Sequence, residues 1–70
     1  MVKIKRVLSD SYTVEFDNEI MFNKVKTYLM NCECGFDHSN ETSATFHSNK
    51  VLKAIIAYCL KDGINFNVEF

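Results

Sequence analysis

Three stretches of the chain have the hydrophobic and polar pattern of β-strands. Residues 2–8 and 12–16 are separated by the turn-forming residues Ser9–Ser11, so we expect the first two strands to form a hairpin. Residues 64–70 alternate strictly between apolar and polar side chains and predict the last strand. The residues expected to point inward are Tyr12, Val14 and Phe16 in the hairpin and Ile64, Phe66, Val68 and Phe70 at the end.

Two other stretches repeat their apolar residues at helical spacing. The first extends to about residue 31 from a cap at Asp17 or Asn18, and its apolar residues share an arc of roughly 120°. Ile20 and Met30 lie outside this arc among polar residues, so we expect both side chains to be partly exposed. The residues expected to be buried are Met21, Phe22, Val25, Tyr28, Leu29 and Cys32.

The second helix is predicted from a cap at Ser48 or Asn49 to Lys61, with Gly63 at the left-handed position that ends helices. Its apolar residues cover close to half of its circumference, and lysines line the remaining face with Ala54 and Ala57 between them. We expect this helix to be the more deeply buried of the two, with its apolar side facing the core. The apolar residues are Val51, Leu52, Ile55, Ile56, Tyr58, Cys59 and Leu60, and the lysines are Lys50, Lys53 and Lys61.

Between the helices, Gly35 is the expected stop of the first one, residues 33–41 form a polar turn segment, and residues 42–46 form a short strand. The resulting order is β-β-α-β-α-β. Because each strand has one apolar face, we expect a two-layer α+β sandwich over residues 1–70, with a mainly antiparallel sheet and both helices on one face. The open face would then carry Lys3, Lys5, Thr13, Glu15, Asn65, Asn67 and Glu69.

Composition narrows the class of protein further. A chain of 70 residues and 8.1 kDa with 47% hydrophobic residues fits one domain, and no apolar run approaches the ~20 residues that span a bilayer. A net charge of −1 supplies no global field for nucleic acid. Three cysteines are few for a disulfide-stabilised secreted domain, so we expect free thiols and a cytoplasmic location.

The cysteines and histidines raise the question of a metal or catalytic site. Cys32 and Cys34 are separated by one residue, whereas structural zinc sites usually have two between paired cysteines, so we expect no metal and no cofactor. A Cys34 nucleophile with His38 or His47 as base and Asp37 as orienting group would need side chains within about 3 Å of each other. Any small domain contains such a triplet by chance, so we do not expect an enzyme.

Two binding functions remain, and the first is recognition of another protein. An interface needs an apolar anchor with a polar rim, which we assign to Ile20, Met30, Phe36 and His38. An uncovered edge strand offers a second route, and both a monomer and a homodimer stay open. The alternative is a nucleic-acid-binding module that uses the lysine face of the second helix, formed by Lys50, Lys53 and Lys61.

The order of segments also resembles that of the small early proteins of T-even-type phages, the Dmd antitoxins among them. The likeness covers about half of the chain: the N-terminal strand pair, residues 18–24 and 49–54, which open the two helices, and Lys61-Asp62 before the last strand. This chain departs from that pattern in a longer middle segment, residues 31–48, and a longer last strand. The resemblance implies an inhibitor that binds a host toxin or nuclease in the host cytoplasm.

Overall fold

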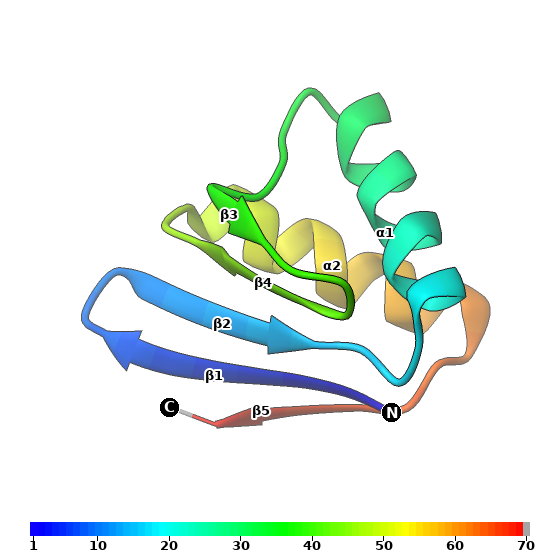
Figure 1. Cartoon of the computed structure of the whole chain (residues 1–70), viewed down its shortest axis with the longest axis horizontal. Helices are drawn as coiled ribbons and strands as arrows, with labels where there is room; N and C mark the ends of the chain where they lie inside the picture. The colour runs from blue at the N-terminus through cyan, green and yellow to red at the C-terminus, as the bar shows by residue number, and fades with distance from the viewer. Residues whose placement is uncertain (70) are drawn as a thin grey trace.

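The computed structural model describes residues 1–69, and its sheet and helices form two layers (Figure 1). The strands are β1 (Val2–Leu8), β2 (Ser11–Glu15), β3 (His38–Ser39), β4 (Ser43–Phe46) and β5 (Phe66–Glu69). The helices are α1 (Glu19–Asn31) and α2 (Asn49–Asp62). The predicted α+β sandwich is therefore confirmed, with β3 as an additional strand that the sequence pattern did not indicate.

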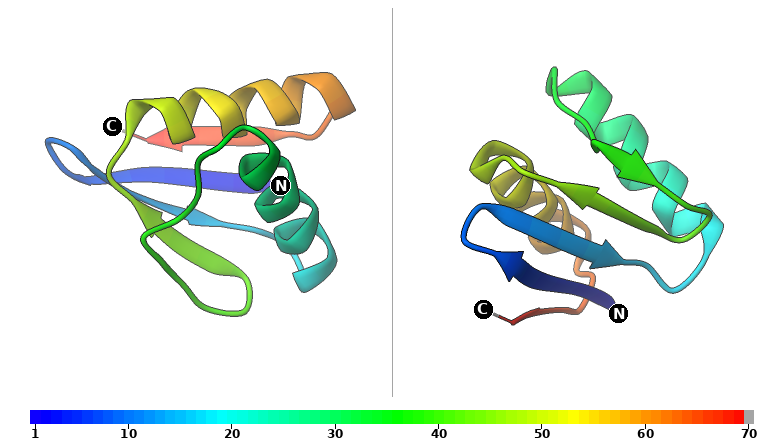
Figure 2. Two further views of the ribbon diagram at one scale, coloured as in Figure 1. Left: turned by 90° about the horizontal axis from the view of Figure 1, so that it is seen from above. Right: turned by 60° about the vertical axis from the view of Figure 1, so that its left-hand side comes forward.

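The strands form one sheet in the order β3-β4-β2-β1-β5. Neighbouring strands are antiparallel except for β1 and β5, which are parallel in a register that pairs Val2 with Phe66 and Ile4 with Val68. The parallel pair arises because α2 carries the chain back across the sheet between β4 and β5. Figure 2 shows both helices on one side of the sheet, as the one-sided apolar pattern predicts.

The core lies between the sheet and the helices. The predicted inward residues of the hairpin are buried, and Phe22, Val25 and Leu29 of α1 are buried with them. Ile64, Phe66 and Val68 are only half-buried, because β5 is at the edge of the sheet, and Phe70 lies outside the described residues. The remaining buried residues are Val2, Ile4, Ala44, Phe46, Val51, Leu52, Ile55, Tyr58 and Cys59.

One residue of the expected α2 core is exposed. Leu60 has 69% of its surface accessible, and Ile56, one turn earlier, is half-buried. The helical period placed both within the apolar arc, but that arc is wider than the surface the sheet covers. The prediction that Leu60 is buried is therefore wrong.

The two helices begin as predicted, and α1 ends differently. Asn18 caps α1 by accepting a hydrogen bond of 2.9 Å from the Met21 N–H, and Ser48 caps α2. Gly63 ends α2 with φ +66°, as expected. Gly35 does not end α1: the left-handed residue is Glu33, with φ +59°, and the helix stops at Asn31. Among residues 1–69, no helix is long and apolar enough to cross a membrane.

Candidate partner-binding surface

The outer side of α1 presents two large apolar residues to solvent. Ile20 is 69% exposed and Met30 is 67% exposed, in agreement with their predicted position outside the buried arc. The rise of 1.5 Å per residue places them about 15 Å apart along the helix, with Asn23 and Thr27 between them. An apolar pair flanked by small polar side chains has the composition of a protein-binding surface.

Ile20 also borders a hollow between the two helices, which we call the helix groove and define by Ile20, Lys24, Tyr28, Tyr58 and Asp62. The rings of Tyr28 and Tyr58 meet in it with their centroids 5.2 Å apart. The helical spacing of both tyrosines predicts that they belong to the core. A tyrosine has an apolar ring and a polar tip, so it can pack inward and still line a groove.

Both tyrosines of the helix groove keep their phenol protons at neutral pH. Burial and the neighbouring Asp62 carboxylate raise the pKa of Tyr58. The pKa of Tyr28 is raised as well, chiefly by its electrostatic interaction with the Cys32 side chain one turn away. Each phenol already has a hydrogen-bonding neighbour, the Asp62 side chain for Tyr58 and the Cys32 side chain for Tyr28. The rings remain as contact surface, and tyrosine is among the residues enriched at the centres of protein interfaces.

Phe36, expected to be an exposed contact residue, instead packs against the core. Its ring stacks on Phe22 at 5.8 Å and lies 6.2 Å from Phe46 and 6.3 Å from Phe16, between ring centroids. The loop that carries it covers the β4 side of the sheet, where neither helix reaches (Figure 2). This half-buried position corrects the expected exposure of Phe36.

His38 is exposed on β3, at the opposite edge of the sheet from β5. It lines a small hollow with Thr13 and Thr45 on the sheet, separate from the residues of the helix groove. The structure therefore leaves Ile20 and Met30 exposed on the same helix, about three turns apart, and places Phe36 and His38 elsewhere.

The residues of the suggested catalytic triplet are only partly assembled. Asp37 and His47 form an exposed pair between a carboxylate oxygen and Nδ1 of the ring. The Cys34 thiol instead donates to the Leu29 carbonyl at 3.4 Å, and within residues 1–69 no hydrogen bond joins it to either histidine. In the same residues, no three side chains of the metal-binding types converge on a metal site.

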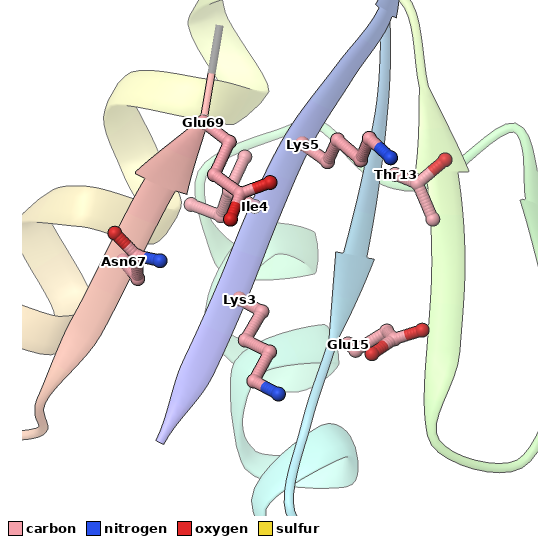
Figure 3. Close-up of a pocket in the computed structure, with 7 residues that line it drawn as sticks. All are labelled: Lys3, Ile4, Lys5, Thr13, Glu15, Asn67 and Glu69. Atoms are coloured by element: carbon pink, nitrogen blue, oxygen red, sulfur yellow. The ribbon is translucent and has the colours of Figure 1, made fainter.

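Six of the seven residues predicted for the open face line one hollow there, and Asn65 is not among them (Figure 3). Lys3 stands opposite Glu15, and Lys5 stands opposite Glu69. The hollow between them measures about 210 Å³, below the ~300–1,000 Å³ of typical small-molecule sites. Because each lysine has an acidic neighbour in register, this face presents little net charge to an anionic partner.

Features of a nucleic-acid interface are sparse on the described residues. Lys50, Lys53 and Lys61 are exposed on α2, but helical rise spreads them over about 16 Å. Tyr12 and Phe46, the aromatic residues considered for base stacking, are buried and stack on each other at 5.2 Å. Single-strand binders combine a basic groove with accessible rings, and this arrangement supplies neither feature at one place.

Comparison of the chain with family models, with curated proteins and with solved structures finds no match.

Proposed function

We propose that this chain is a small non-enzymatic protein that binds a partner protein stoichiometrically and so inhibits or modulates it. The observation that carries the proposal is the surface of α1, where Ile20 is 69% exposed beside the paired tyrosines of the helix groove. Hot spots of protein interfaces combine an apolar anchor with tyrosines in a setting of polar residues.

The chemistry of the helix groove favours a protein partner over a nucleic acid. Its charged members are one lysine and one aspartate, Lys24 and Asp62, so it offers no excess of positive charge for phosphates. A partner that inserts an apolar side chain beside Ile20 would also contact the two tyrosine rings. Met30 would then extend the contact along α1.

The resemblance to small early phage proteins supports a narrower version of this proposal, an inhibitor of a host toxin or other defence factor. Two of the segments that carry the resemblance, residues 18–24 and 49–54, open α1 and α2. The first of them contains Ile20 and Lys24 of the helix groove. An inhibitor of this size acts by occupying a surface of its target, which requires an exposed anchor and no chemistry of its own.

The experiment is affinity capture from host lysate with and without nuclease treatment, followed by titration of the captured partner in purified form. Ile20→Glu places a charge at the centre of the proposed contact. Leu8→Glu is the matched control, because Leu8 is equally open to solvent, at 65%, on the β1–β2 hairpin. We expect Ile20→Glu to weaken binding at least about 30-fold, the loss of one hot spot of about 2 kcal/mol, and Leu8→Glu to leave it unchanged.

Two results would overturn the proposal. If Ile20→Glu and Leu8→Glu behave alike, the partner does not contact α1. If capture depends on intact nucleic acid and falls steeply with salt, the lysine face of α2 is the working surface and the nucleic-acid function replaces the protein-binding one.

A further inference from the structure

The outer edge of β5 directs backbone hydrogen-bonding groups away from the sheet. The Val2 N–H donates to the Asn65 carbonyl at 2.9 Å, so the Asn65 carbonyl points toward β1 and shows which residues of β5 bond to β1. Backbone groups of a strand alternate between its two sides, so Asn67 faces β1 while the N–H and C=O of Phe66 and Val68 point outward. Among residues 1–69, no strand pairs with this edge.

Apolar side chains accompany this edge on the helix side. Phe66 and Val68 are half-buried, and Phe66 lines a hollow with Leu60, which is 69% exposed on α2. Figure 3, viewed from the open face, shows α2 behind β5 and extending past its outer edge. A strand added beside β5 would therefore lie against apolar side chains and close to the end of α2.

The two edges of the sheet differ in how they are protected. At the other edge, β3 has only two residues, both exposed and polar, and such short strands are a common defence against unwanted pairing. At β5, the described residues show no bulge, and residues 63–69 contain neither lysine nor proline. Three of the devices that usually block edge pairing, a bulge, lysine and proline, are therefore missing from the described part of the β5 edge.

We propose that the β5 edge binds a second copy of this chain by antiparallel pairing of the two β5 strands around a two-fold axis at Asn67. In this register Phe66 of one protomer stands opposite Val68 of its partner, and the reverse pair forms on the other side of the axis. Both are residues with outward N–H and C=O groups, so the two pairs exchange four backbone hydrogen bonds. An interface of this kind is self-complementary, as two-fold symmetry requires.

The charges agree with this register. On the open face, Asn67 meets its own copy, and Asn65 stands opposite Glu69 of the other protomer. Like charges that face each other across two strands destabilise a sheet, and this register contains no such pair. On the helix side Phe66 and Val68 cover each other, and Leu60 lies beside them.

Cysteine crosslinking tests the register directly. The two copies of Asn67 form a pair without mutual backbone hydrogen bonds, whose Cα atoms lie about 4.5 Å apart, within disulfide range. We expect Asn67→Cys to give a covalent dimer on mild oxidation. Asn65→Cys is the matched control, since its counterpart is Glu69 and not another cysteine. The wild-type chain, with its three free cysteines, sets the background.

Sedimentation measures the dimer without any crosslink. We expect wild type to pass from 8.1 kDa to twice that mass as its concentration rises. Leu60→Lys places a charge beside the paired strands and should weaken dimerisation at least tenfold. Val68→Pro removes an outward N–H but leaves the hydrogen bonds to β1 intact, so it should abolish dimerisation. Leu8→Lys makes the same change on the β1–β2 hairpin and should leave dimerisation unchanged. A mass of 8.1 kDa up to millimolar concentration, or equal crosslinking of Asn65→Cys and Asn67→Cys, would overturn the proposal.

Discussion

The end of α1 holds a residue in a conformation that suits glycine better. Glu33 has φ +59°, and its N–H donates to the Met30 carbonyl at 3.1 Å while the Cys34 N–H donates to the Leu29 carbonyl at 3.0 Å. These two bonds define a Schellman motif with Glu33 at the position where glycine is preferred. The substitution Glu33→Gly should therefore stabilise the protein.

The size of the effect follows from three contributions. A side chain in the left-handed region costs roughly 1–2 kcal/mol, and glycine removes that cost. Glycine also gives the unfolded chain more freedom, which takes back about 0.5–1 kcal/mol. Glu33→Gly also removes a carboxylate from beside the negative end of the helix dipole, which stabilises the folded state by about 0.3 kcal/mol at this exposed site. The net gain is about 1 kcal/mol, or a melting temperature about 4–8 °C higher.

Urea denaturation of a small set of variants separates these contributions. Glu33→Ala removes the charge but keeps a Cβ atom, so it should gain only the electrostatic part. Gly35→Ala should stabilise by about 0.4–1 kcal/mol, because the φ angle of Gly35 is not left-handed and an added Cβ meets no atom within 4 Å. If Glu33→Gly is no more stable than Glu33→Ala and Gly35→Ala is destabilising, α1 ends at Gly35 and the reasoning fails.

Three further predictions concern the core and the open face. Phe36→Ala should lower the free energy of unfolding, measured by urea titration, by about 2 kcal/mol, which is less than the ~3–5 kcal/mol lost when a fully buried phenylalanine is truncated. If the free energy of unfolding does not change, the ring is in solvent. Burial raises the pKa of the Cys59 thiol above its ordinary 9.0, so the folded state holds this proton more tightly than the unfolded state does. The free energy of unfolding should therefore be unaffected below pH 9.0 and fall above it, and this fall should be smaller in Cys59→Ala. Lys5→Glu places a second negative charge opposite Glu69 and should lower the free energy of unfolding by about 0.2–1 kcal/mol, more at low salt. Adding Glu69→Lys should restore stability, and no recovery in the double variant would mean that the two side chains do not interact.

Most of the fold could be predicted because the chain uses simple periodic patterns. Alternation in the hairpin and in residues 64–69, and helical spacing in α1 and α2, each place apolar residues on one face, and burying those faces together leaves few architectures. The strand β3 escaped prediction because its residues His38 and Ser39 are both polar and exposed. Its conformation comes from hydrogen bonding to β4, which leaves no hydrophobic pattern in the sequence.

The candidate site was less predictable, because exposure depends on what covers a residue and not only on its spacing. Ile20 and Met30 could be identified, since polar neighbours surround them in the helical projection. Leu60 could not, because it belongs to the apolar arc of α2 and is exposed only at the margin of the sheet. Phe36 is the reverse case: an isolated aromatic residue in a polar loop that fills a gap between the layers.

The two proposed surfaces lie on different sides of α2, and this arrangement sets how they would act together. Tyr58 lines the helix groove, while Leu60, two residues later and about 200° around the helix, lines the hollow beside β5. Pairing of two β5 strands would therefore leave each helix groove open, and a dimer would bind two partner molecules. If the dimer does not form, each separate chain would still bind one partner through Ile20, so each proposal stands or falls on its own measurement.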